Sequence, residues 1–148
     1  MVFKINIAEK SKTYKLETEA PNLIGKELHD KISGNNVSQD LEGYEFEITG
    51  TSDKAGFTSM KEVEGIGLKK VLLKYGKGLH KKPKGEKKKG SKPKGLRLRK
   101  TVRGKVISEA ISQINLKTLK QGTKKLAEIF PDQNKVPEPK KVVEEKNE

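Results

Sequence analysis

Short stretches of alternating apolar and polar residues in the first half of the chain predict β-strands. Val2–Ile7 and Tyr14–Glu17 alternate and are separated by a polar turn, which is typical of a pair of strands. Tyr44–Ile48 shows the clearest alternation, with its apolar side chains facing inward. Val71–Tyr75 is apolar enough to predict a strand that is buried on both faces. Because the turns between these segments contain Gly, Asn and Asp, we expect residues 1–75 to form a small β-barrel domain or a strongly twisted sheet.

The last third of the chain predicts one further strand and a short C-terminal helix, which together make up residues 106–130. Gln113–Leu119 has the apolar positions of a strand that returns to the sheet. A short helix over Ser108–Ile111, with Ser108 as its N-cap, is an additional prediction. Thr123–Phe130 has its apolar residues on one helical face, with Thr123 as the expected N-cap and Pro131 directly after its end. The predicted fold class is therefore mainly β.

Glycine and proline interrupt the chain between these two regions. The segment Gly76–Gly95 contains five glycines and two prolines among its lysines, a density that is incompatible with a helix or a strand. We therefore expect residues 76–105 to form an extended basic arm. Residues 131–148 hold three of the six prolines and mixed charge, which predicts a disordered tail.

The net positive charge of the protein comes from one segment. The formal net charge is +13, yet Lys69–Lys105 alone contains 17 Lys or Arg and a single acid, Glu86, which gives this segment +16 and the remainder −3. A block of like charges of this length repels itself in water and is neutralised by a polyanion. The distribution predicts that the segment binds nucleic acid, while the rest of the chain acts as a scaffold.

Basic residues of the arm are the candidate contacts to nucleic acid. Arg97, Arg99 and Arg103 are the only arginines of the chain, and a guanidinium can bind phosphate through two hydrogen bonds and stack on bases. The alternation of Leu and Arg over 96–99 favours an extended segment with one anchored face and one face that presents the guanidiniums. RNA is favoured over DNA, because the sequence has no helix-turn-helix, zinc-finger or basic-zipper pattern. The candidate RNA-binding residues are Lys54, Lys81, Lys82, Lys87, Lys88, Lys89, Lys92, Lys94, Arg97, Arg99, Lys100, Arg103 and Lys105.

The turn Gly50–Phe57, which contains Lys54, has two interpretations. Its backbone amides and Lys54 could approach a phosphate, or Ser52 and Asp53 could cap a purely structural turn in which glycine permits positive φ. The sequence does not distinguish the two.

Composition argues against several functional classes. With no Cys, the chain has no disulfide, thiolate metal site or cysteine nucleophile. His29 and His80 do not predict a metal site, and no segment matches a dinucleotide-binding or phosphate-binding loop pattern. We expect no enzymatic activity, no cofactor, no metal and no small-molecule substrate. The N-terminal residues lack a signal-peptide pattern and no apolar run approaches the roughly 20 residues that span a bilayer, so we expect a cytoplasmic protein with no membrane partner.

Four segments resemble a known family in their residues, order and spacing: Ile48–Phe57, Arg99–Gly104, Ile107–Ser108 and Gln113–Lys117. Together they resemble the archaeal–eukaryotic small-subunit ribosomal protein six of the e type, in its archaeal form. The resemblance covers roughly residues 1–130. It implies a small β-barrel, a basic extension buried in small-subunit ribosomal RNA, neighbouring ribosomal proteins as partners, and no enzymatic activity.

Two alternative functions are compatible with the residues alone. A free-standing nucleic-acid-binding protein, such as a chromatin protein or an RNA chaperone, could use the lysine-rich arm to bind any polyanion. An enzyme or translation factor could use the barrel as a substrate cradle, but the sequence has no catalytic constellation to support it.

Overall fold

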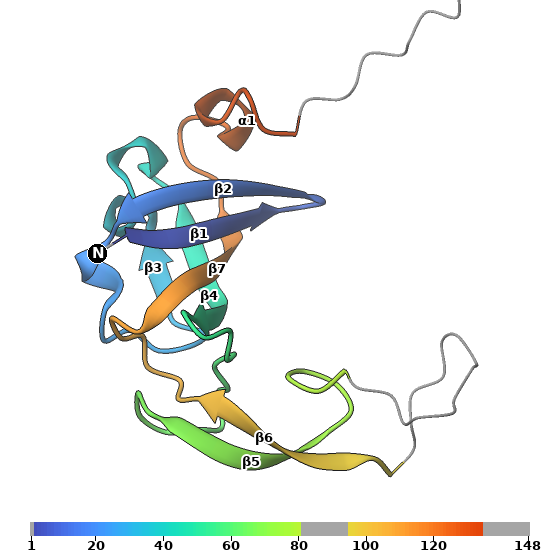
Figure 1. Ribbon diagram of the computed structural model, residues 1–148. Coiled ribbons are helices and arrows are strands. Elements are labelled where there is room, and N and C mark those ends of the chain that lie inside the picture. The colour runs from blue at the N-terminus through green and yellow to red at the C-terminus, as the bar shows by residue number, and fades with distance from the viewer. Residues whose placement is uncertain (1, 81–94, 135–148) are drawn as a thin grey trace, which may run out of the picture.

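The computed structural model describes residues 2–80 and 95–134, which form two β-sheets and one short α-helix (Figure 1). The larger sheet has five strands in the order β2-β1-β7-β4-β3, and the smaller sheet pairs β5 with β6. The strands and the helix are β1 (Val2–Glu9), β2 (Lys12–Glu19), β3 (Lys31–Ser33), β4 (Glu45–Asp53), β5 (Leu68–Lys74), β6 (Arg97–Arg103), β7 (Ile111–Lys120) and α1 (Leu126–Ile129). The mainly β fold class expected from the sequence is confirmed.

β7 lies at the centre of the larger sheet and joins two parts of the chain that are distant in sequence. It runs parallel to β1, with Ile114 opposite Ile5, and antiparallel to β4, with Leu116 opposite Ile48. β2 and β3 pair antiparallel with β1 and β4 at the two edges. The prediction that a strand around Gln113–Leu119 returns to the sheet is confirmed.

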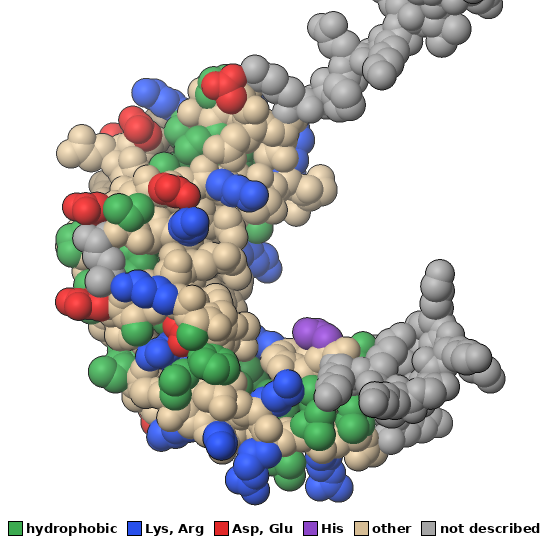
Figure 2. Space-filling model, in the orientation of Figure 1, with side chains coloured by type: hydrophobic (Ala, Val, Ile, Leu, Met, Phe, Trp, Pro, Cys, Tyr) green, Lys and Arg blue, Asp and Glu red, His purple; other side chains and the backbone are tan. Residues whose placement is uncertain are grey.

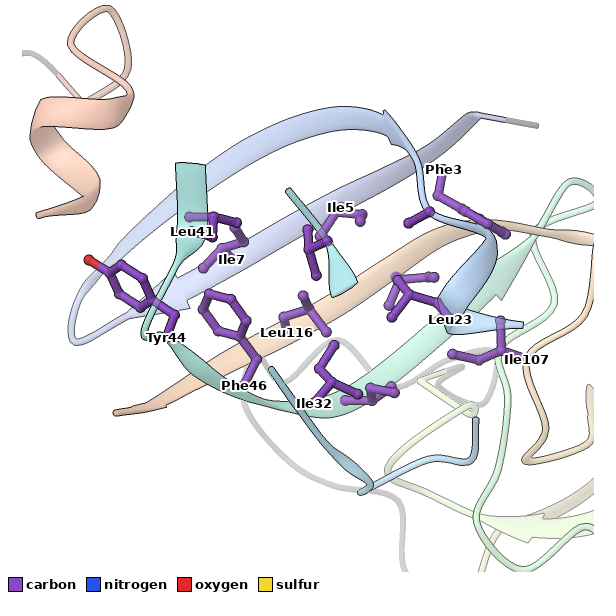
Figure 3. Close-up of a cluster of buried hydrophobic side chains, with 14 of the residues drawn as sticks. Phe3, Ile5, Ile7, Leu23, Ile32, Leu41, Tyr44, Phe46, Ile107 and Leu116 are labelled. Carbon is purple, nitrogen blue, oxygen red and sulfur yellow. The ribbon is translucent and has the colours of Figure 1, made fainter. Parts of the chain in front are cut away.

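One face of the larger sheet carries the main hydrophobic core. Phe3, Ile5 and Ile7 of β1 and Phe46 and Ile48 of β4 are all 0% exposed. All five belong to one hydrophobic cluster, and the side chains of β1 and of Phe46 point into a shared interior (Figure 3). Complete burial of one such side chain stabilises the fold by about 1.5–3 kcal/mol, so the alternation seen in the sequence reflects the main stabilising contacts.

The larger sheet is open, whereas the sequence led us to expect a barrel. Its edge strands β2 and β3 are not paired with each other in the described part of the chain. Leu23 in the 3₁₀ helix Pro21–Leu23, Leu41 in the 3₁₀ helix Gln39–Leu41, and Leu126 in α1 are fully buried in the same core. These turns and the helix complete the burial of the core, so further strand pairing is not needed to cover it.

The smaller sheet lies beyond one end of the larger sheet and has only one covered face (Figure 1). Val102 is buried on the covered face, and Val63 and Leu79 are likewise buried outside the main core. On the other face, Leu72 is 55% exposed. The prediction that Val71–Tyr75 is buried on both faces is wrong, because Leu72 and Lys74 lie on a face of β5 that is exposed.

Two local predictions near the C-terminus are wrong in detail, although the short helix itself is confirmed. Lys125, with extended backbone, is the N-cap of α1 and makes no capping bond through its side chain. Thr123, the expected N-cap, donates its hydroxyl hydrogen to the Glu42 carbonyl, 3.4 Å away. Ser108–Ile111 forms only a hydrogen-bonded turn, since Ile111 already begins β7.

Two of the segment boundaries proposed from the sequence can be compared with the structure, the one at residue 75 and the start of the tail at residue 131. The boundary at residue 75 falls between β5 and β6, which are hydrogen-bonded to each other along their length. Gln133, in the predicted tail, hydrogen-bonds both the amide (2.7 Å) and the carbonyl (2.8 Å) of Lys15 at the edge of β2. The arm residues 81–94 and the tail residues 135–148 lie outside the described residues.

Candidate nucleic-acid interface

The uncovered side of the smaller sheet carries four exposed cations, Lys70, Lys74, Arg97 and Arg99, and we name it the basic face. In the antiparallel register Lys74 lies opposite Arg97, and Leu72 lies opposite Arg99. Side chains directly opposite one another share a face, and alternate residues along each strand return to it. The pairing of β5 with β6 therefore gathers cations from two segments that are more than 20 residues apart.

The basic face stands out from the rest of the surface. Lys and Arg side chains gather along the margin of the molecule formed by β5 and β6, whereas acidic and basic side chains are interspersed over the larger sheet (Figure 2). Neither β5 nor β6 contains an Asp or Glu residue. Positive potential is therefore concentrated on this ribbon of two strands.

The opposition of Lys74 and Arg97 is unfavourable in the isolated protein. Like charges that lie directly opposite each other across an antiparallel pair destabilise it. No carboxylate from either strand is available to offset the repulsion. An anion such as a phosphate group, placed over the ribbon, would remove it and gain charge-assisted hydrogen bonds from the guanidinium.

Arg103 forms a buried ion pair inside the protein. Its Nε and Nη2 both lie 3.0 Å from Oδ2 of Asp53, and its Nη1 donates to the Ile66 carbonyl at 2.9 Å. Burial alone would raise the pKa of the Asp53 carboxyl, but hydrogen bonds from the Phe57 amide and from Arg103 outweigh it and hold the pKa below its ordinary value. The charge of this predicted RNA contact is thus already neutralised.

Lys105 is neutralised in a similar way. Its ammonium lies 2.9 Å from a carboxylate oxygen of Glu27 and 3.0 Å from one of Glu64. Hydrogen bonds to Glu27 and then to Glu64 raise the pKa of Lys105 above its ordinary value. These contacts tie the chain that leaves β6 to two preceding loops.

The turn that contains Lys54 uses its backbone amides internally. The Phe57 amide donates to Oδ1 of Asp53 (2.8 Å), the Gly56 amide to the Asp53 carbonyl (3.0 Å), and the Lys54 amide to the Ala110 carbonyl (3.2 Å). The structural interpretation of this turn is therefore favoured. Lys54 itself has an exposed side chain and keeps its charge available.

The candidate residues of the arm divide into four groups, one of which is the ion-paired Arg103 and Lys105. Arg97 and Arg99 lie together on the basic face, whereas Lys100 alternates onto the covered side. Lys81, Lys82, Lys87, Lys88, Lys89, Lys92 and Lys94 lie outside the described residues. Lys70 and Lys74 were not among the candidate residues; both lie within the basic segment Lys69–Lys105, but the pairing of β5 with β6 that places them beside Arg97 and Arg99 has no signal in the sequence.

Over residues 2–80 and 95–134, no group of His, Cys, Asp and Glu side chains is placed to hold a metal ion. In the same ranges no helix has both the length and the apolar character needed to cross a membrane.

Comparison with known proteins identifies relatives along most of the chain. The family model described as Ribosomal protein S6e matches residues 1–92 and 90–131. The small ribosomal subunit protein eS6 of Methanococcus maripaludis (strain C5) is 42% identical over 125 residues, covering 83% of this chain and 91% of that protein. The eS6 proteins of Methanosphaera stadtmanae and Halobacterium salinarum (strain R1) are 39% and 36% identical, covering 89% and 86% of this chain and 95% and 92% of their own lengths. The chain therefore belongs to the ribosomal protein S6e family.

Proposed function

We propose that this chain is a non-enzymatic structural component of the small ribosomal subunit, and that it binds ribosomal RNA through the basic face together with the lysine-rich segment 81–94. Its relatives are small-subunit ribosomal proteins by name. The observation that carries the RNA contact is the opposition of Lys74 and Arg97 with no acid on either strand. Phosphate groups of an RNA backbone are the polyanion that this arrangement fits. In this role the protein acts on the ribosome in the cytoplasm, beside neighbouring ribosomal proteins.

Two classes of basic residue have different roles in this proposal. Arg103 and Lys105 are paired with carboxylates and position β6 rather than compete for phosphate. The other candidate residues, together with Lys70 and Lys74, are proposed to contact RNA. They are Lys54, Lys70, Lys74, Lys81, Lys82, Lys87, Lys88, Lys89, Lys92, Lys94, Arg97, Arg99 and Lys100.

Co-sedimentation with small subunits through a sucrose gradient tests the proposal. A basic-face variant replaces four cations of the smaller sheet with Gln: Lys70, Lys74, Arg97 and Arg99. A matched control variant removes the same number of exposed charges from elsewhere on the protein: Lys12, Lys15, Lys117 and Lys124. We expect the control variant to sediment with small subunits like the wild type, and the basic-face variant to shift to the free pool as salt is raised.

Two results would contradict the proposal. Wild-type protein found only in the free pool at low salt would exclude a ribosomal role, and equal affinity for random duplex DNA would then favour the free-standing binder. Equal sedimentation of both variants across the salt series would exclude the basic face as the RNA contact.

A further inference from the structure

One edge of β6 is hydrogen-bonded to β5, and the other edge is only partly covered. At Arg103 the backbone amide donates to the Thr58 carbonyl and the carbonyl accepts from the Met60 amide, both at 3.0 Å, so these groups point away from β5. In an antiparallel pair the backbone polar groups of alternate residues point to the same side. The backbone amides and carbonyls of Thr101, Arg99 and Arg97 therefore also point away from β5. No described residue forms a backbone hydrogen bond with these groups on that edge.

The segment that covers Arg103 turns away before it reaches Thr101. Ser59 forms a parallel bridge with Arg103, but the chain just before it is held in the turn closed by Asp53 and Phe57. The turn contains Gly56 at φ +88°, a conformation that L side chains rarely adopt. A cleft of about 490 Å³ is left beside the edge. It is lined by Gly56, Phe57, Thr58, Gly78, His80 and the β6 residues 99–101.

The two edges of the larger sheet, unlike the outer edge of β6 in the described part of the chain, are protected from pairing with further strands. Gln133 pairs its side-chain amide with both backbone groups of Lys15 in β2, and the Asn134 side chain donates to the Thr13 carbonyl at 2.8 Å. At the opposite edge, β3 is only three residues long. Covering an edge or keeping it short are common ways to prevent unwanted strand pairing. The outer edge of β6 has neither protection among the described residues.

We propose that the outer edge of β6, at Arg97–Thr101, accepts an extended acidic segment of another protein as an additional strand. Main-chain hydrogen bonds to the outward-facing backbone groups of Arg97, Arg99 and Thr101 would fix the register of the added strand, as in other cases of strand addition. Arg97 and Arg99, which share one face of β6, supply charge complementarity for alternating Glu or Asp side chains on the same face of an added strand. The same cations repel a second copy of this chain, and RNA lacks the alternating amides and carbonyls of a strand. The proposal does not depend on the RNA-binding role of the basic face.

A backbone substitution separates strand addition from simple charge attraction. Thr101→Pro removes the outward amide hydrogen without removing a charge or a hydrogen bond to β5, since proline is tolerated where a strand's amide faces outward. Thr101→Val keeps that amide and is the matched control. The probe is an eight-residue peptide of alternating Glu and Val, compared with the same peptide N-methylated at alternate residues and with an eight-nucleotide uridine RNA. The full chain is used throughout.

We expect the acidic peptide to bind the wild type and Thr101→Val within twofold of each other, and Thr101→Pro at least tenfold more weakly. In the wild type, the amide hydrogens of Arg97, Arg99 and Thr101 should exchange more slowly with solvent when the peptide is present, a readout that does not rely on the proline variant folding well. Absence of this protection would overturn the proposal. Equal binding of the N-methylated peptide, or equal protection by the RNA, would also overturn it. Each of these outcomes can arise whether or not the basic-face variant leaves the ribosome, so the two proposals fail separately.

Discussion

Arg103 and Asp53 join the two sheets through a single carboxylate oxygen, since Nε and Nη2 of Arg103 both lie 3.0 Å from Oδ2 of Asp53. Asp53 is the last residue of β4, and Arg103 is the last residue of β6. The side chains are 2% and 13% exposed, so the pair is largely removed from water. This contact holds the smaller sheet, with its basic face, against the end of the larger one.

Asp53→Asn is expected to lower the free energy of unfolding by about 3 kcal/mol, because removing one partner of a buried ion pair leaves the other charge uncompensated. Asn retains an oxygen that can accept the hydrogen bond from the Phe57 amide. The loss therefore reports on the contact with Arg103, and urea denaturation near neutral pH measures it.

An exposed ion pair provides the control for this measurement. Lys4 and Glu17 lie 3.8 Å apart, and their side chains are 65% and 67% exposed. Glu17→Gln should change the free energy of unfolding by no more than about 0.5 kcal/mol, because water screens such pairs. Similar losses in the two variants would mean that the buried pair does not connect the sheets energetically.

Acid should weaken the contact between Asp53 and Arg103. The pKa of Asp53 is lowered in the folded state, so between that pKa and the unfolded value of about 3.9 the unfolded chain binds more protons. Stability then rises with pH over this interval, is fully present above it, and is lost as the pH falls through the folded pKa. The stability gap between wild type and Asp53→Asn should narrow as the pH drops below about 4. Unfolding curves at a series of pH values check this, and a gap that stays constant into strong acid would contradict it.

The strands of the main core could be predicted from the sequence because each has an alternating pattern with one buried face. Phe3 and Phe46 are both fully buried, in agreement with the alternation of their segments. The exposure of Leu72 could not be predicted in this way, since an apolar strand gives no information about whether a second layer will cover it. The open sheet was missed for a related reason: Leu23 and Leu126 close the core from turns and a helix, without further strand pairing.

The candidate site was predictable in its charge and not in its geometry. Density of Lys and Arg pointed to the segment that contains β6, but the basic face depends on the register that sets Lys74 opposite Arg97. The separation of Arg103 from the other arginines depends on Asp53, which is 50 residues away in sequence. Neither relationship has a local sequence signal, because both arise only when the sheets assemble.

Gly104→Ala is expected to lower the free energy of unfolding by at least about 2 kcal/mol through overpacking. A Cβ at this position would overlap the backbone carbonyl of Gly65, which cannot move without displacing its turn. Gly67→Ala is the control, since a Cβ there meets nothing within 4 Å and should change stability by about 0.5 kcal/mol or less. Thermal unfolding of both variants measures the difference, and comparable stability would show that the chain leaving β6 can shift freely past residue 65.

The basic face should also determine how strongly RNA binding depends on salt. Each phosphate contact that is lost makes the slope of log affinity against log salt shallower by about 0.7–0.9, so removing four contacts should change the slope by about 3. If the whole protein neutralises about ten phosphates, the wild-type slope should be on the order of −7 to −9. The measurement is the affinity for a small-subunit RNA fragment over a series of potassium chloride concentrations. It compares the wild type with the basic-face variant and with the control variant, which lacks four charges on the larger sheet and its C-terminal extension. The control should keep the wild-type slope, since its lysines are interspersed with acids. A wild-type slope shallower than about −3 would mean that too few phosphates are neutralised for the basic face to be the main RNA contact. The same change in both variants would mean that general positive charge holds the RNA, and not the paired strands β5 and β6.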